Sequence, residues 1–202
     1  MRGKFITFEG VDGAGKSTHV EWFADLLRAD GHQVLVTREP GGSPLAEKLR
    51  ELVLHDAMDA LTETLLMFAA RDDHLRQRIL PALAAGKWVV CDRFTDSTLA
   101  YQGGGKGVDK AAIESLAKIV HADLKPDCTL VFDCPYEVSH SRMAGSGRAL
   151  DRFEREGQAF FERVRMAYLS AAKNAPGRVK IIDSTQALEA IRQTVRTIAG
   201  GL

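Results

Sequence analysis

Residues 10–17 of the chain read Gly-Val-Asp-Gly-Ala-Gly-Lys-Ser. They follow an apolar run at 5–8 that is typical of a strand, and they precede residues 17–28, whose apolar side chains recur at helical spacing. A strand, a glycine-rich turn and a helix are the setting in which the pattern G-x-x-x-x-G-K-[ST] holds phosphate. We therefore expect the whole loop to bind ATP, through Gly10, Val11, Asp12, Gly13, Ala14, Gly15, Lys16, Ser17 and Thr18.

The loop also predicts how the triphosphate is held. Its glycines allow successive backbone N–H groups to turn towards phosphate oxygens at the positive end of a helix. Lys16 is expected to reach the β- and γ-phosphates, and the hydroxyl of Ser17 to ligate Mg²⁺. Mg²⁺ is accordingly the expected cofactor, entering with the nucleotide.

The composition limits the other classes of protein. The chain has 202 residues, 45% of them hydrophobic and 27% charged, which suits a single globular domain over 1–202. Its 27 basic and 27 acidic residues cancel, so no overall field recruits nucleic acid or an anionic membrane. No apolar run approaches the length of a membrane span. We expect neither a nucleic-acid nor a membrane partner.

The cysteines and the first residues bear on the compartment. Cys91, Cys128 and Cys134 are odd in number, form no C-x-x-C pair and lie in or beside apolar runs, as buried free thiols do. The first strand begins within a few residues of Met1, which leaves no room for a signal peptide. The cytoplasm is the expected location.

Five short apolar runs predict the sheet, and helical patterns alternate with them. This alternation predicts an α/β fold of the P-loop NTPase type, with a five-stranded parallel sheet covered by helices on both faces. The longest helical patterns run over 61–80 and 153–172. The expected strands are Phe5–Phe8, Val34–Thr37, Trp88–Cys91, Thr129–Phe132 and Val179–Ile182.

Four of these runs end in a charged residue, namely Arg38, Asp92, Asp133 and Asp183. In an open parallel sheet the ligand crevice lies beyond the carboxyl ends of the strands, so position alone makes them candidates for a site. For Asp133 and Asp183 we favour the other common role of such a carboxylate, which is to cap a helix.

Five stretches, of which the phosphate loop is one, carry a resemblance that the loop alone does not. Together they make the chain similar to the thymidylate kinases of bacteria, from the first strand to the helix after the lid. The stretches are Phe8-Glu-Gly-Val-Asp-Gly-Ala-Gly-Lys-Ser-Thr18, Thr37-Arg-Glu-Pro-Gly-Gly42, Leu66-Met-Phe-Ala-Ala-Arg71, Cys91-Asp-Arg-Phe-Thr-Asp-Ser-Thr98 with Tyr101-Gln-Gly103, and Leu150-Asp-Arg-Phe-Glu154.

The resemblance implies how the acceptor dTMP is bound. Arg38 and Arg93 hold its phosphate, which suits the forked donors of a guanidinium. Phe68 stacks on thymine, and Arg71, one helical turn further on, donates to the base carbonyl O4. Thr98, together with Gln102, meets the other polar edge of the base.

The resemblance also implies roles near the sugar and the phosphates. Tyr101 closes over the sugar, where a ribose 2′-hydroxyl would protrude, and Asp12 lies near the 3′-hydroxyl. Lys16, Arg93, Asp12 and a lid arginine are the expected catalytic residues. Asp92 either orients a metal-bound water, as a metal-site residue beside Ser17, or holds Arg93.

Members of this family carry a catalytic arginine either in the phosphate loop or in the lid. The loop has Gly13 before Ala14 and offers no such cation there. We therefore expect the lid-arginine type, with a short mobile lid over about 141–152 and with Arg148 as the first candidate. Arg142 is the second candidate, or it packs on adenine at the ATP site. Phe94 stands where the family often has tyrosine.

The predicted reaction is transfer of the γ-phosphoryl group of ATP to dTMP, giving dTDP and ADP for dTTP synthesis, by a homodimer. Two alternatives stay open, a kinase for another nucleoside monophosphate and a P-loop ATPase that is not a kinase. Only the kinases need an acceptor, so phosphorylation of an added monophosphate separates these classes.

Overall fold

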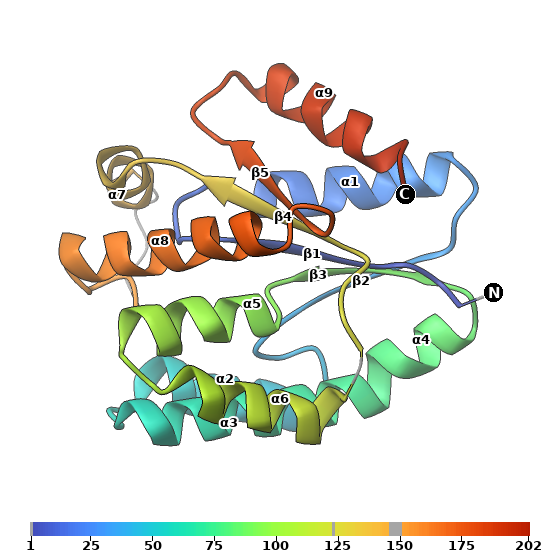
Figure 1. Ribbon diagram of the computed structural model, residues 1–202. Coiled ribbons are helices and arrows are strands. Elements are labelled where there is room, and N and C mark those ends of the chain that lie inside the picture. The colour runs from blue at the N-terminus through green and yellow to red at the C-terminus, as the bar shows by residue number, and fades with distance from the viewer. Residues whose placement is uncertain (1, 123, 146–150) are drawn as a thin grey trace.

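The computed structural model describes residues 2–122, 124–145 and 151–202. Its centre is one parallel five-stranded sheet with the strand order β2-β3-β1-β4-β5, which confirms the expected fold (Figure 1). Each strand extends one or two residues beyond its apolar run. The strands are β1 Phe5–Gly10, β2 Val34–Arg38, β3 Trp88–Asp92, β4 Cys128–Asp133 and β5 Val179–Asp183.

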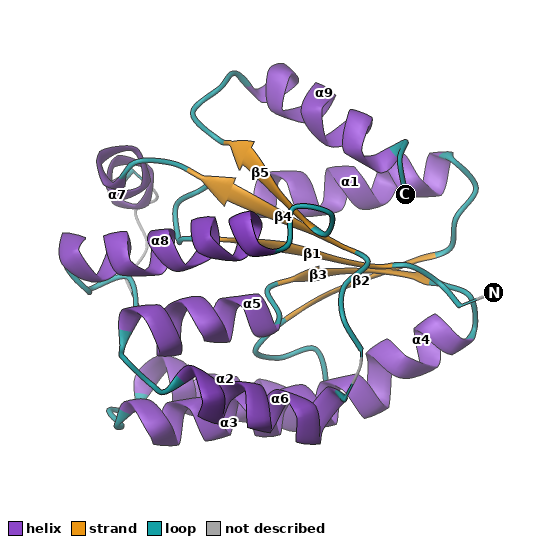
Figure 2. Ribbon diagram, viewed as in Figure 1, coloured by secondary structure: helices purple, strands orange, loops and turns teal. Residues whose placement is uncertain are grey.

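Helices cover both faces of this sheet (Figure 2). One face carries α1 and α9, and the other carries α4, α5 and α8, with α2, α3 and α6 packed outside that layer. In chain order the helical segments are α1 Ser17–Ala29, α2 Pro44–His55, α3 Ala60–His74, the π-helix η1 Leu75–Ile79, α4 Leu80–Ala84, α5 Thr95–Thr98, the π-helix η2 Leu99–Gly105, α6 Lys110–His121, α7 Tyr136–Ala144, α8 Gln158–Asn174 and α9 Leu188–Ala199.

The alternation of β1 divides the core in two. Ile6 and Phe8 pack with Phe23 of α1 on one face, while Phe5 packs with Phe94 on the other. Glu9 follows the parity of Phe5, so its carboxylate enters the second face, below the carboxyl end of the sheet. The face of β1 that is apolar at Phe5 therefore ends in the polar residue Glu9, beside the start of the phosphate loop.

The structure corrects the two longest helical predictions. Residues 61–80 are not one α-helix, because the π-helix η1 follows α3 and leads into α4. Pro81 explains why the helix widens into a π-helix here. Proline has no N–H group to donate, and in a regular α-helix its ring clashes with the carbonyl four residues earlier. The helix expected at 153–172 begins only at Gln158, after an extended Gly157. The Asp151 carboxylate instead accepts the N–H groups of residues 153 and 154 in a turn.

The predicted strand ends are confirmed, but the favoured cap roles are wrong. Asp133 accepts both Nε and Nη2 of Arg165, at 2.7 and 2.9 Å. Asp183 closes the turn before α9 by accepting the N–H and the hydroxyl of Thr185. Ala187, and not Asp183, stands at the start of α9.

Among the helices of the described residues, none has both the length and the apolar character needed to cross a lipid bilayer. The three cysteines are buried and unpaired, as expected.

Candidate active site

A cavity of about 670 Å³ opens at the carboxyl edge of the sheet, where β1, β2 and β3 end. The phosphate loop forms one wall, and the turn after β2 and the segments after β3 form the others. Most of the predicted residues meet here. The predicted residues on its wall are Asp12, Gly13, Gly15, Lys16, Ser17, Thr18, Arg38, Arg71, Asp92, Arg93, Thr98, Tyr101, Gln102 and Arg142.

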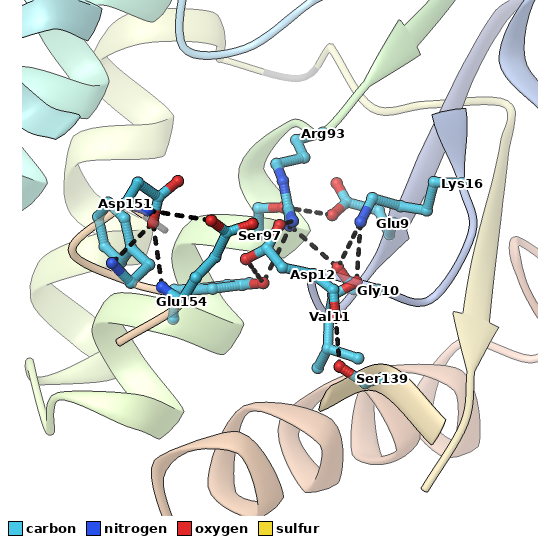
Figure 3. A network of polar contacts seen from close by, with 12 residues as sticks. Glu9, Gly10, Val11, Asp12, Lys16, Arg93, Ser97, Ser139, Asp151 and Glu154 are labelled. Carbon is cyan, nitrogen blue, oxygen red and sulfur yellow. Dashed lines mark hydrogen bonds and ion pairs between the residues drawn. The ribbon is translucent and has the colours of Figure 1, made fainter. Parts of the chain in front are cut away.

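The phosphate loop takes the shape its glycines allow. Gly10 has a φ of 129°, and a Cβ there would lie 2.3 Å from the carbonyl oxygen of Phe132 on the neighbouring strand. Lys16 Nζ donates to the carbonyls of Gly10 and Val11, both at 3.0 Å (Figure 3). Burial lowers the pKa of Lys16, and the nearby charge of Arg93 lowers it further. Ala14 is buried in the core side of the loop.

Arg93 and Asp12 form the polar centre of the site (Figure 3). Arg93 follows β3 with a φ of 71°, an unusual conformation for a residue with a Cβ. Its Nη2 lies 2.5 Å from Asp12 Oδ1, and the Tyr101 hydroxyl donates to Asp12 Oδ2 at 2.8 Å. Burial alone would raise the pKa of Asp12, but Arg93 and Lys16 lower it to about 2. Asp12 is therefore a charged acceptor at neutral pH.

Glu9 is buried beside this polar centre and accepts three hydrogen bonds. Its Oε1 accepts the N–H of Phe94 at 2.7 Å, and its Oε2 accepts the hydroxyls of Ser97 and Tyr168 at 2.5 and 2.9 Å. Arg93 Nη1 donates to Ser97 Oγ at 3.2 Å. Burial, and next the charge of Asp96, raise the pKa of Glu9 to about 7.

Arg71 lies at the far end of the cavity and is 3% exposed. Its Nε donates to Glu39 Oε2 at 2.6 Å and its Nη2 to Thr98 Oγ1 at 3.1 Å. Its Nη1 is buried and has no hydrogen-bond partner among the described residues. A buried donor without a partner is rare, so the geometry leaves this N–H for an acceptor in the cavity.

Phe68 is placed differently from the other predicted residues. It is 1% exposed and is not among the described residues that line the cavity. The Arg71 guanidinium lies 4.8 Å from its ring centroid and 5.0 Å from that of Phe94. Phe94 and Met67 are the cavity-lining neighbours, and stacking of Phe68 on thymine stays a prediction.

Two arginines form a second cationic region of the cavity, beside the turn after β2. Arg38 is exposed and forms a two-bond ion pair with Glu47, at 3.0 and 2.8 Å. Arg50, on α2, lines the same wall and donates to the carbonyl of Pro40 at 2.9 Å. Burial and the charge of Arg38 lower the pKa of Arg50. Two cations on one wall of the cavity suit the binding of an anion such as a phosphate.

The residues predicted for Mg²⁺ fit such an ion. Asp92 Oδ1 is buried without a hydrogen-bond partner among the described residues, and Ser17 lines the same cavity. Both offer the hard oxygen donors that Mg²⁺ prefers. Among the described residues, no group of three or more acidic, histidine or cysteine side chains lies together in a way that could hold a metal by itself. One carboxylate and one hydroxyl match the few protein ligands that Mg²⁺ takes when phosphates complete its shell.

The two lid arginines have different outcomes. Arg142, on α7, lies beside the phosphate loop, with Nη1 3.5 Å from the Gly13 carbonyl and Nη2 2.8 Å from the Ser184 carbonyl. Arg148 lies outside the described residues. Its role therefore stays a prediction.

The site contains residues that the sequence analysis did not single out. Glu9, Glu39 and the 151–154 segment lie within the matched stretches, and their positions there were the available signal. Arg50 and His74 stand on helices, where a charged or polar residue reads as part of a solvated face. Gln102 is a predicted residue with an unforeseen partner, since its Nε2 donates to the buried carboxylate of Glu63 at 2.7 Å.

Comparison with known proteins identifies one family over nearly the whole chain. The family model described as thymidylate kinase matches residues 8–195. The thymidylate kinase of Bordetella pertussis is 59% identical over 191 residues, which cover 95% of this chain and 91% of that protein. That of Cupriavidus metallidurans is 54% identical over 202 residues, the full length of both. A crystal structure of thymidylate kinase from Ehrlichia chaffeensis superposes with a TM-score of 0.80 at 34% identity, over 99% of each chain. The chain belongs to the thymidylate kinase family.

Proposed function

We propose that the chain transfers the γ-phosphoryl group of ATP to dTMP, giving dTDP and ADP. The observation that carries this proposal is that one cavity is lined both by the phosphate loop and by a second region that suits a nucleotide. That region has the cations Arg38 and Arg50 at one wall and the unpaired N–H of Arg71 at its far end. A motor or sensor ATPase has no use for this second region.

The chemistry needs little beyond positioning. The attacking atom is a phosphate oxygen of dTMP that is already anionic near neutral pH, so no general base is required. The protein must bring two polyanions into line and balance the charge on the transferring group. Lys16 and Arg93 both line the cavity and both donate to the Gly10 carbonyl, and in this proposal they supply that charge. Asp12 holds Arg93 in place by their 2.5 Å contact.

Mg²⁺ enters with ATP in this proposal. Ser17 and Asp92 are the residues that would hold it, directly or through water. When bound, the ion neutralises phosphate charge and fixes the orientation of the triphosphate. Asp92 would contribute a carboxylate at the end of β3, next in sequence to Arg93.

The acceptor is proposed to be dTMP because of Arg71. A guanidinium whose charge is balanced by Glu39 suits a neutral carbonyl such as thymine O4. Thr98 lies beside Arg71, and Tyr101 lines the same cavity and donates to Asp12 of the phosphate loop. Cytosine presents an amino donor at the same position, and two opposed donors leave a hydrogen bond unmade.

We further propose one kinase domain over 1–202 that carries its remaining cation in a lid at about 141–152. Arg148 stays the first candidate for the transition-state cation. Arg142 is the second, and its place beside Gly13 and Ser184 also suits a contact with the nucleotide of ATP.

We propose that the enzyme works as a homodimer in the cytoplasm. Leu61 and Leu65 of α3 and Ile119 of the neighbouring α6 are exposed by 53, 48 and 77%, which supports a face for a second copy. The free buried cysteines support a reducing compartment. Sedimentation of the wild type and of Leu65→Glu tests the dimer, which the charge should dissociate.

The acceptor is tested by product analysis with ATP and equal amounts of dTMP, dUMP, dCMP, AMP or GMP. The proposal predicts that dTDP forms at the highest kcat/KM. A higher value for dCMP or a purine nucleotide would assign the chain to another monophosphate.

A further inference from the structure

His74 is fully buried at the end of α3, one turn beyond Arg71, and it lies outside the reacting centre. Both of its ring nitrogens have partners. Nδ1 lies 3.1 Å from Glu39 Oε1, and Nε2 lies 2.7 Å from Thr37 Oγ1. A carboxylate only accepts hydrogen bonds, so Nδ1 carries a proton towards Glu39, and the Thr37 hydroxyl is the hydrogen-bond partner of Nε2.

The other oxygen of the same carboxylate holds Arg71. Glu39 Oε2 accepts Arg71 Nε at 2.6 Å, so Thr37, His74, Glu39 and Arg71 form one chain of hydrogen bonds that is buried except at Thr37. Burial alone would raise the pKa of Glu39, but Arg71 and the His74 hydrogen bond hold it below its ordinary value. The carboxylate is therefore charged, and it neutralises Arg71 beside the cavity.

The turn after β2 is shaped around this ring. Gly42 has a φ of 85°, and a Cβ there would lie 2.3 Å from His74 Nε2 and 2.6 Å from its Cδ2. The Arg-Glu-Pro-Gly-Gly stretch thus supplies both the carboxylate that His74 holds and the space that its ring needs. His74 and this turn are fitted to each other.

We propose that His74 is a positioning residue for base selection, acting through Glu39 to aim the free Nη1 of Arg71 at the base carbonyl of the acceptor. Apart from Glu39, Arg71 contacts the Thr98 hydroxyl and the two rings that flank its guanidinium. These contacts do not hold the Glu39 carboxylate in position. His74 alone among these groups joins the carboxylate to β2. The inference rests on the proposed function.

The test separates the base from the rest of the ligand. Binding of dTMP and of 2-deoxyribose 5-phosphate, which lacks the base, is measured by calorimetry on the full chain. In His74→Leu, dTMP binding should weaken about tenfold, as for one lost hydrogen bond to a charged group. The sugar phosphate should change less than twofold. His74→Asn keeps an N–H near the position of Nδ1 and should recover most of the affinity.

His121 offers a matched control, because its two nitrogens also contact a threonine hydroxyl and an acceptor, Thr95 and the Leu124 carbonyl. His121→Leu should leave the ratio of the two affinities unchanged. If His74→Leu does not fold, Thr37→Val applies the same test from the other end of the chain and should weaken dTMP binding alone.

Equal losses for both ligands would reduce His74 to a purely structural role and overturn the proposal. So would an unchanged dTMP affinity, or losses from His74→Leu and Glu39→Gln that simply add in the double variant. Failure of the proposed function is a different result, since the wild type would then neither prefer dTMP over dCMP nor phosphorylate it.

Discussion

Glu9→Gln should change how the stability of the protein depends on pH. Three oxygens meet at this residue, since Glu9 Oε2, Ser97 Oγ and Tyr168 Oη lie 2.5, 2.9 and 2.8 Å apart. When Glu9 is ionised, both hydroxyls donate to Oε2 and no proton is left for the contact between Ser97 and Tyr168. When Glu9 is protonated, three protons are available for the three contacts. This count agrees with the raised pKa of Glu9, which burial and Asp96 bring from 4.5 to about 7.

The sign follows from proton binding. Between these two pKa values the folded protein holds a proton on Glu9 that the unfolded chain has released, so rising pH removes stability. The slope approaches about 1.4 kcal/mol per pH unit inside that window. Relative to Glu9→Gln, which does not titrate, the wild type should lose about 2 kcal/mol of unfolding free energy between pH 5 and pH 8.

Urea unfolding of both proteins at pH 5, 6, 7 and 8 measures this difference. Groups that titrate in both proteins, such as His19 and His121, cancel when the two free energies are subtracted. A difference that stays constant with pH, or one that moves in favour of the wild type as pH rises, would refute a protonated Glu9.

Four other changes test the site. Lys16→Ala should lower kcat about a hundredfold or more, because it deletes a preorganised cation at the transferring phosphate; near-normal turnover of the folded variant would remove the loop from catalysis. Arg71→Ala should shrink the preference for dTMP over dCMP, which about 1–3 kcal/mol of opposed donors creates in the wild type; equal kcat/KM values for both in the wild type would contradict this. Tyr101→Ala should raise the use of the ribose counterpart of dTMP relative to dTMP; an unchanged ratio would place Tyr101 outside the sugar site. Arg148→Ala should lower kcat and kcat/KM together with little change in dTMP affinity; the same loss in Arg142→Ala alone would exchange their roles.

The fold was predictable because its signals are local. Five apolar runs that alternate with helical patterns can form only a few sheet topologies. In the one observed, β1, the strand before the phosphate loop, lies at the centre between β3 and β4. Helix boundaries were less predictable. Nothing in the apolar periodicity of 61–80 reveals the π-helix before Pro81, and the Asp151 turn delays α8 although Phe153 fits the helical pattern.

The residues of the site were likewise predictable only in part. Charged residues at strand ends, such as Arg38 and Asp92, follow from topology, and Arg71 follows from the stretch around it. The partners that hold them do not. Glu9 and Tyr168 are 159 positions apart in the sequence, and Glu39 meets His74 only because the turn after β2 packs on α3. Sequence patterns give which residues reach the cavity, while long-range packing decides which buried groups aim them.

The measurement that bears most directly on the central claim is the release of ADP from ATP by the purified chain, with and without dTMP. A kinase site that joins a phosphate loop to an acceptor region should release ADP only when dTMP is present, with one dTDP formed for each ADP. ADP release at the same rate without any monophosphate, and without dTDP, would contradict the account and favour a P-loop ATPase.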